Sequence, residues 1–360
     1  MPHTPPCPAL ITWQDGQPFS PLYGDRYHTL SGARAQAEHV FLGGCGLPRA
    51  WLSDGQAEQA SLPSCQTAGH PAQADFPPTH AHLPAPENPE PASPAQHPSG
   101  RWTILETGFG LGLNFLSTWA SWLANRPDPV PAAAGHDTRA IRHLRFVSTE
   151  AHPASADDIR QAAVDDPVLQ PLAAQLARYW ADASLQAPVL HFCFPPPACP
   201  TTSIATTTPP ATATIPSGEN VHRTAATGSA TPSLTPTGTS PATLATTSIP
   251  GAADVPDDGT VELIILLGDT TRVLDAWLQQ HGPLHADSVF LDGFDPRKNP
   301  AMWQASTLQS LARHCRPGTR LATWCVARSV RDALAASGFV CEKRPGLPPK
   351  RHCLGACLQG

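Results

Sequence analysis

The thirteen residues from Leu291 to Trp303 concentrate side chains that could do chemistry. They run Leu-Asp-Gly-Phe-Asp-Pro-Arg-Lys-Asn-Pro-Ala-Met-Trp and follow a short apolar segment, 288–291, that predicts a buried strand. Asp292 would then stand at the carboxyl end of that strand, the edge where open α/β sheets bind ligands. Because a carboxylate, two cations, an amide and an indole lie so close together, we predict a polar site here. The alternative is a surface loop that only turns the chain.

A second candidate segment follows the predicted strand 102–105 and contains Glu106, Gly108, Gly110, Gly112 and Asn114. Alternating glycines allow a sharp turn and the close approach of a ligand, and the helix that follows would offer free N–H groups. The spacing is Gly-x-Gly-x-Gly, which differs from the Gly-x-Gly-x-x-Gly of dinucleotide binders. An acid at position 106 would disfavour a pyrophosphate and favour a cationic amino-acid group. The loop therefore favours S-adenosylmethionine over the alternative, a nicotinamide cofactor on a similar sheet in an NAD(P)-dependent oxidoreductase.

Acids also stand at the ends of the other predicted core strands. Glu150 follows strand 144–148 and could accept hydrogen bonds from ribose hydroxyls, as acids do in dinucleotide folds. Asp269 follows strand 261–267 and could accept a hydrogen bond from an adenine amine. Together with Glu106 and Asp292, these residues predict a ligand with several donors lying across the sheet edge.

Strand-like and helix-like segments alternate along most of the chain. Strands are expected at 102–105, 144–148, 189–194, 261–267, 288–291, 320–324, 338–343 and 352–357, and helices at 111–123, 153–163, 168–181, 271–280, 304–316 and 327–336. The alternation predicts an α/β domain with a mainly parallel sheet and helices on both faces. The segments 189–194 and 261–267 could form a hairpin, because a hairpin tip tolerates a long insertion.

Composition divides the chain into four parts. Residues 1–56 are interpreted as an N-terminal extension that packs on the main domain. Residues 57–100, rich in Pro, Ala, His and Gln, and residues 195–257, rich in Thr, Pro and Ala, lack hydrophobic periodicity and are expected to be disordered insertions. The segments 101–194 and 258–360 remain as a single domain of ordinary size.

Charge and cysteine usage limit the function classes. Residues 293–360 hold eleven Lys and Arg against three acids, a net of +8, whereas the whole chain carries −6. Such asymmetry is typical of a face that meets a polyanion, and the alternative is a solvated basic surface. The ten cysteines show no zinc-binding spacing, so no metal is expected. The N-terminal sequence predicts no signal peptide and no apolar run is long enough to span a bilayer, so a cytoplasmic protein without membrane contact is expected.

These motifs resemble the methyltransferase part of the MnmC family of bacterial tRNA-modifying enzymes. The resemblance covers Glu106–Phe115, Gly268-Asp269, Leu291–Trp303, Lys350-Arg351 and the segment Trp13–Trp51. It implies a class I, Rossmann-like fold with antiparallel C-terminal strands and S-adenosylmethionine as the methyl donor. The implied reaction methylates the aminomethyl group of 5-aminomethyl-(2-thio)uridine at the tRNA wobble position, so the implied partner is a tRNA anticodon stem-loop.

The chain departs from the family pattern in its two long insertions and near its C-terminal residue. Bifunctional members continue into an FAD-dependent oxidase, whereas this sequence stops at Gly360, so the chain is interpreted either as a stand-alone methyltransferase or as a truncated copy of the longer enzyme. In the first case a separate FAD-dependent oxidase could supply the aminomethyl substrate. The family motif Lys-Arg-Glu is here Lys350-Arg351-His352. Two alternatives stay open beside the oxidoreductase: a non-catalytic tRNA-binding relative and a methyltransferase for a small amine.

The resemblance also gives roles to individual residues. Asp292 is the predicted catalytic residue, which orients the substrate amine and helps to take its proton; the alternative is that it only fixes the loop. Phe294 and Trp303 could stack a base from the anticodon loop, although Trp303 also fits a core position that caps its helix. The rest of the predicted substrate set is Lys298, Lys350 and Arg351, as phosphate contacts, and Asn299.

Overall fold

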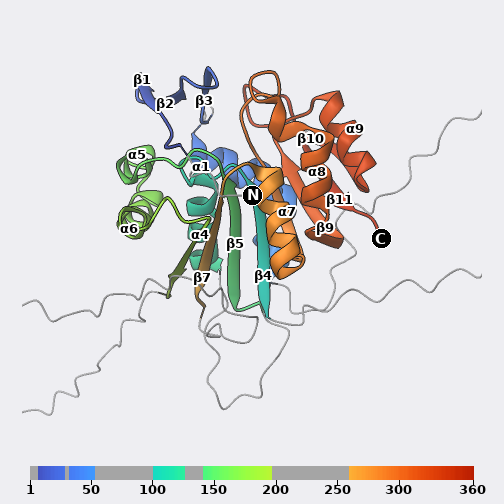
Figure 1. The fold of residues 1–360 in the computed structure, drawn as a ribbon, viewed down its shortest axis with the longest axis horizontal. Helices are drawn as coiled ribbons and strands as arrows, with labels where there is room; N and C mark the ends of the chain where they lie inside the picture. The colour runs from blue at the N-terminus through green and yellow to red at the C-terminus, as the bar shows by residue number, and fades with distance from the viewer. Residues whose placement is uncertain (1–6, 29–31, 53–99, 126–140, 197–258) are drawn as a thin grey trace, which may run out of the picture. The chain divides into compact units, whose positions relative to one another are not determined.

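An eight-stranded mixed sheet in the order β10-β11-β9-β8-β4-β5-β7-β6 forms the centre of the fold (Figure 1). This computed structural model describes residues 7–28, 32–52, 100–125, 141–196 and 259–360. The strands are β4 (Arg101–Thr107), β5 (His143–Glu150), β6 (Val189–Phe194), β7 (Val261–Leu267), β8 (Ala286–Leu291), β9 (Cys315–Thr323), β10 (Phe339–Pro345) and β11 (His352–Leu358).

The central strands run parallel and the outer ones do not. β4 pairs in parallel with β5 and β8, β5 with β7, and β8 with β9. β6 is antiparallel to β7, and β11 is antiparallel to both β9 and β10. From β4 the chain continues to β5 and β7 on one side and later returns to β8 on the other side. The strand order therefore reverses between β4 and β8, and open α/β sheets bind ligands outside the carboxyl ends of strands at such a point.

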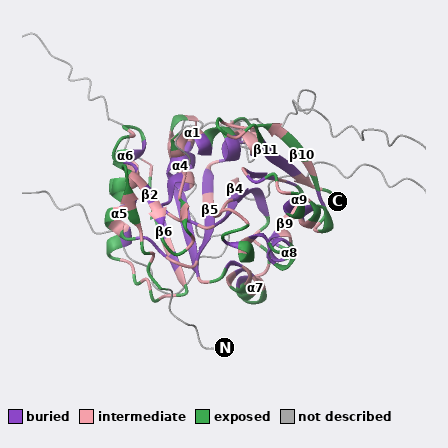
Figure 2. Cartoon of the chain, turned by 90° about the horizontal axis from the view of Figure 1, so that it is seen from above, coloured by how far each residue is buried: buried purple, intermediate pink, exposed green. Residues whose placement is uncertain are grey.

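Helices cover both faces of the sheet and enclose two apolar cores. α4 (Leu113–Asn125) contacts α6 (Leu169–Ala181), which contacts α5 (Ala156–Ala162), whereas α8 (Ala305–Ala312) contacts both α7 (Thr270–His281) and α9 (Arg328–Ala336). Successive strand residues point to opposite faces, so Ile104 joins the α4 side and Leu105 the α7 side. Seen from above, β4 and β5 are buried between these layers (Figure 2).

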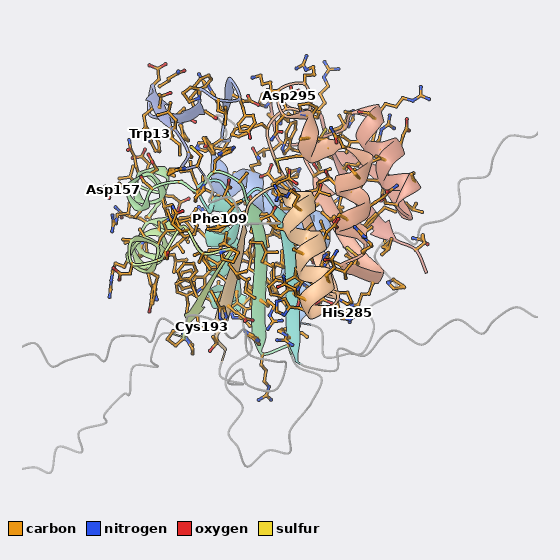
Figure 3. All side chains as sticks on the ribbon, in the orientation of Figure 1. Trp13, Phe109, Asp157, Cys193, His285 and Asp295 are labelled. Atoms are coloured by element: carbon orange, nitrogen blue, oxygen red, sulfur yellow. The ribbon has the colours of Figure 1, made fainter. Side chains whose placement is uncertain are left out.

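The N-terminal segment reaches the carboxyl edge of the sheet. It forms a small antiparallel sheet of β1 (Thr12–Gln14), β2 (Gln17–Ser20) and β3 (Asp25–Arg26), followed by α1 (Ala33–Gln36), a π-helix (Ala37–Leu42), α2 (Gly43–Cys45) and α3 (Arg49–Leu52). The Asp295 N–H donates to Asp25 Oδ2 at 3.0 Å. In Figure 3, Trp13 and Asp295 lie at one end of the sheet, and His285, which precedes β8, lies at the other.

The predicted fold class is confirmed: the sheet is mainly parallel, helices cover both faces, and the C-terminal strands are antiparallel. The predicted hairpin of 189–194 with 261–267 is also confirmed, since β6 pairs along its whole length with β7 in antiparallel orientation. The helix expected at 304–316 is too long. A 3₁₀ turn occupies Pro300–Trp303, α8 ends at Ala312, and β9 begins at Cys315, where the chain already pairs with Ala286.

Both predicted insertions fall almost entirely outside the described residues, and so does the small second unit, 197–248, into which the chain divides. Their expected disorder stays a prediction. In the part of the chain that the structure describes, no helix has the length and apolar character needed to cross a membrane.

Candidate active site at the carboxyl edge of the sheet

A cleft of about 1050 Å³ opens at the point where the strand order reverses. Its volume is at the upper end of the range for small-molecule sites, which run from roughly 300 to 1,000 Å³. Its walls come from the ends of β4, β5, β7, β8 and β9, from the loop before β11 and from the N-terminal segment. They include Gly108, Gly110, Asn114, Glu150, Asp269, Asp292, Phe294, Asn299 and Lys350 of the predicted site, together with Tyr23, Asp25, Tyr27, His152, Met302 and Trp324.

The glycine loop after β4 is held in shape by its own amides. Its three glycines have φ values of 78°, 56° and 73°, which only glycine adopts readily. The N–H groups of Gly108 and Phe109 both donate to Thr149 O at 3.0 Å, and the Gly110 N–H donates to Glu150 Oε2 at 2.6 Å. These three amides are therefore engaged within the protein, and the loop contributes close approach rather than free donors at these positions.

Glu150, at the end of β5, supports that loop and also faces the cleft. Besides Gly110, the His152 N–H donates to its carboxylate at 2.6 Å. Burial raises the pKa of Glu150, and the hydrogen bonds from backbone amides oppose this. A carboxylate has about four lone-pair sites, so it retains capacity to accept hydrogen bonds from a ligand. Asp269 instead uses Oδ1 to cap α7 through the Arg272 N–H at 3.1 Å.

Asp292, at the end of β8, carries three hydrogen bonds from protein donors. Its Oδ1 accepts from the Gly293 N–H at 2.8 Å and from Trp324 Nε1 at 2.9 Å, and its Oδ2 accepts from Asn114 Nδ2 at 2.9 Å. Burial raises the pKa of Asp292, while these donors stabilise its charged form. The side chain of Asp292 is thereby fixed in one orientation beside the glycine loop.

Glu106 lies beneath the floor of the cleft and not in its wall. It is 1% exposed and accepts from Ser148 Oγ at 2.7 Å. Burial, together with the negative charges of Asp292 and Glu150, raises its pKa well above the ordinary value. Glu106 does not border the cleft, and its predicted contact with a cationic ligand group stays a prediction.

Some of the predicted site residues in the loop after β8 line the cleft, and others lie behind or outside it. Phe294 lines the cleft and stacks on Tyr23 with a centroid distance of 4.7 Å. Trp303 is 5% exposed and donates through Nε1 to Phe294 O at 2.8 Å, the core position anticipated as its alternative role. Lys298 lies outside the cleft, where its Nζ pairs with Asp25 Oδ1 at 2.9 Å. Asn299 is buried in the cleft wall.

The two basic residues near the C-terminus separate in space. Lys350 lines the cleft, with its Nζ 3.4 Å from the centroid of the Trp324 ring, and burial lowers its pKa. Arg351 is exposed. A phosphate contact therefore suits Arg351 better than Lys350. Gly112 lies in the same glycine loop as Gly108, but it does not border the cleft.

Sequence reasoning missed several side chains of the cleft. Tyr23, Asp25 and Tyr27 belong to a segment that was noted only for its family resemblance, and their contacts span some 270 residues of sequence, as in Asp25 with Asp295. Trp324 is the last residue of the predicted strand 320–324 and directly follows β9, and a search for acids alone at strand ends overlooks it. Among the described residues, no group of three or more His, Cys, Asp and Glu side chains is arranged to hold a metal ion.

Comparisons with known proteins agree with this geometry. Residues 241–359 match a family model described as S-adenosyl-L-methionine-dependent methyltransferase. The chain is 36% identical over 352 residues to the tRNA 5-methylaminomethyl-2-thiouridine biosynthesis bifunctional protein MnmC of Delftia acidovorans, covering 98% of this chain and 35% of that protein. It is also 36% identical over 339 residues to the MnmC protein of Polaromonas naphthalenivorans, covering 94% and 33%. The resemblance inferred from the motifs is confirmed.

The chain spans about a third of the length of these curated relatives. Among solved structures, the crystal structure of MNMC2 from Aquifex aeolicus aligns with a TM-score of 0.49 and 14% identity, covering 98% of this chain and 72% of that chain.

Proposed function

We propose that this chain transfers a methyl group from S-adenosylmethionine to the aminomethyl group of 5-aminomethyl-(2-thio)uridine at the tRNA wobble position. The product is 5-methylaminomethyl-(2-thio)uridine. The observation that carries the proposal is Asp292, oriented by three donors beside the glycine loop, in a cleft at the reversal of strand order. The similarity to the MnmC proteins supports the choice of substrate.

The residues present fit S-adenosylmethionine. In this proposal Glu150 accepts hydrogen bonds from the ribose hydroxyls and Asp269 accepts one from the adenine amine, at the carboxyl ends of the adjacent strands β5 and β7. A Cβ on Gly108 would lie 3.3 Å from Met302 Cε, and one on Gly110 would lie 3.4 Å from the Tyr27 ring, so a side chain at either position would crowd these cleft-lining residues. When bound, the sulfonium supplies an electrophilic methyl group.

The protein's own contribution is alignment. Asp292 accepts a hydrogen bond from the substrate amine and directs its lone pair at the methyl carbon. Alignment of two reactants lowers a barrier by roughly 7–11 kcal/mol in favourable cases.

In this proposal, residues at the mouth of the cleft and on the surface beside it bind the tRNA. Phe294, already stacked on Tyr23, offers an aromatic face to a base that has left the anticodon stack. Arg351 is exposed and available to a phosphate. Each such phosphate contact makes binding weaker as salt rises.

The test is transfer of labelled methyl from S-adenosylmethionine to tRNA that carries 5-aminomethyl-2-thiouridine, with the product nucleoside identified by mass spectrometry. Transfer to that nucleoside, and none to tRNA with an unmodified wobble uridine, supports the proposal. Absence of transfer, or transfer to another position, contradicts it. Equilibrium dialysis against S-adenosylmethionine and against NAD separates a methyltransferase from an oxidoreductase. In this proposal the chain binds S-adenosylmethionine and does not bind NAD.

A further inference from the structure

Asp292 separates two sides of the cleft. In the sheet order, β8 lies between β4 and β9. The glycine loop, Glu150 and Asp269 follow β4, β5 and β7, so the residues proposed to bind the cofactor lie on one side of Asp292. Trp324 follows β9, and Lys350 precedes β11, which pairs with β9, so these two residues lie on the other side. The second side is therefore the one that remains for the substrate.

The hydrogen bonds of Asp292 join the two sides. Its Oδ2 accepts from Asn114 Nδ2 at 2.9 Å, in the helix that follows the glycine loop, and its Oδ1 accepts from Trp324 Nε1 at 2.9 Å. The face of the same Trp324 ring carries the Lys350 Nζ, 3.4 Å from the ring centroid. One indole thus holds a hydrogen-bond acceptor, Asp292, and a hydrogen-bond donor, Lys350, next to each other in the cleft wall.

The amine of Lys350 has N–H groups that a ligand can use. A lysine ammonium has three donors, and among the residues that the structure describes, no acceptor lies within hydrogen-bond distance of this one. Burial lowers the pKa of Lys350, but the Trp324 face and the negative charge of Asp292 favour the ammonium. The Nζ of Lys298 is instead paired with Asp25 Oδ1 at 2.9 Å. Lys350 is therefore the lysine that can donate to a ligand in the cleft.

The charges around Lys350 favour an uncharged acceptor as its partner. Asp292, Asp25 and Asp295 are close enough to act on its pKa, and they would repel a phosphate or a carboxylate. A carbonyl oxygen meets no such repulsion. In the base of the proposed substrate, the carbonyl at position 4 neighbours the carbon that bears the aminomethyl group. That edge of the base presents a donor and an acceptor, which match Asp292 and Lys350.

We propose that Lys350 selects the substrate base by donating a hydrogen bond from Nζ to the carbonyl oxygen at position 4 of the uracil ring whose amine Asp292 holds. This inference rests on the proposed function and adds a residue that recognises the base. A cytosine ring carries an amino group at position 4, so the donors of Lys350 would face another donor. A site built to hydrogen-bond one group rejects the analogue that lacks it, because a polar group is then left unpaired.

Two anticodon stem-loop RNAs test this selection, one with 5-aminomethyluridine and one with 5-aminomethylcytidine at the wobble position. Both offer the same amine for methylation and differ along the edge that Lys350 is proposed to recognise. A hydrogen bond to a charged group is worth a factor of roughly 10 to 150, so the wild type should prefer the uridine RNA by at least about 10-fold in kcat/KM. Lys350→Met removes the donors at similar side-chain length, and the preference should be lost. Lys343→Met, at an exposed lysine of β10, is the matched control and should keep the wild-type preference.

The ratio of the two kcat/KM values is the deciding measurement, because a general loss of folding or of alignment lowers both values equally. A Lys350→Met variant that keeps the wild-type preference overturns the inference, and so does a wild type that shows no preference. Titration with S-adenosylmethionine is the second measurement: a Kd weakened by more than about twofold in Lys350→Met would assign Lys350 to the cofactor and also overturn the inference. If the wild type methylates neither RNA, the proposed function fails as well; if it methylates the uridine RNA and only the Lys350 results disagree, the inference alone fails.

Discussion

Replacing Glu150 with Gln is expected to weaken cofactor binding by a predictable amount. The carboxylate accepts two backbone N–H groups at 2.6 Å, from Gly110 and from His152, and the proposed ligand adds its ribose hydroxyls. Glutamine keeps one carbonyl oxygen and presents an NH₂ group in place of the second oxygen. One of the two backbone donors then faces another donor.

The cost has two parts. A buried donor left without a partner destabilises the fold by about 1–3 kcal/mol. A hydrogen bond to a charged acceptor is worth about 1.5–3 kcal/mol, so loss of the charge should weaken ribose binding by roughly 10- to 150-fold in Kd, since each 1.4 kcal/mol is tenfold. The first cost lowers the stability of the folded glycine loop, and the second lowers the affinity for the ligand.

Isothermal titration with S-adenosylmethionine measures the second part, and thermal unfolding without ligand measures the first. Glu38→Gln is the matched control, because Glu38 is a surface acid that pairs with Arg34, and it should change neither quantity appreciably. A Glu150→Gln variant with lowered Tm and wild-type Kd would show that Glu150 only supports the loop. That result would refute its assignment to the ribose.

Three further changes have expected outcomes. Asp292→Asn should lower kcat by roughly 10- to 150-fold, the worth of one hydrogen bond to a charged acceptor, with cofactor Kd within twofold by titration; unchanged turnover would remove its orienting role. Burial lowers the pKa of His191, but hydrogen bonds to Cys193 and Glu262 outweigh this and raise it to about 9. A raised pKa stabilises the fold below the unfolded value near 6.5, and this contribution is lost as pH rises through about 9. Tm should thus fall over that window, and His191→Gln should flatten the fall in calorimetry; an identical slope would contradict the pairing. Lys298→Met should cost at most about 1 kcal/mol in urea unfolding, because its ion pair is partly exposed; a larger loss would mean that the pair holds the N-terminal segment down.

The order of strands and helices could be predicted because each element carries a local pattern. The run Val261–Leu267 is apolar at nearly every position and becomes a strand buried on both faces. The prediction of a helix at 304–316 was wrong at its C-terminal end because the pattern there is ambiguous. Cys315 and the residues after it suit either a helix end or a strand, and in the structure Cys315 pairs with Ala286 as part of a strand. Such long-range pairing has no local signal.

The site could be predicted only in part, for the same reason. The position of Asp292 and Glu150 could be predicted because acids at strand ends meet at one edge of a parallel sheet, and both line the cleft. Tyr23 could not be placed, because its stacking on Phe294 depends on how the N-terminal segment folds across the cleft. The different positions of Lys298 outside the cleft and of Lys350 in its wall could not be predicted either. Both are lysines in loops, and only their neighbours in the fold distinguish them.

The cluster of acids at the sheet edge also explains why these neighbours matter. Glu106, Glu150 and Asp292 lie close enough that the charges of the latter two raise the pKa of Glu106, and like charges in a buried cluster cannot all be ionised cheaply. The three carboxyl groups receive different numbers of hydrogen bonds from protein donors. Asp292 receives three hydrogen bonds and Glu150 at least two from backbone amides, whereas Glu106 is buried beneath them and its pKa is raised well above the ordinary value. The hydrogen-bond donors thus favour negative charge where the cleft opens, at the two positions that the proposed reaction uses for the ribose and for the amine.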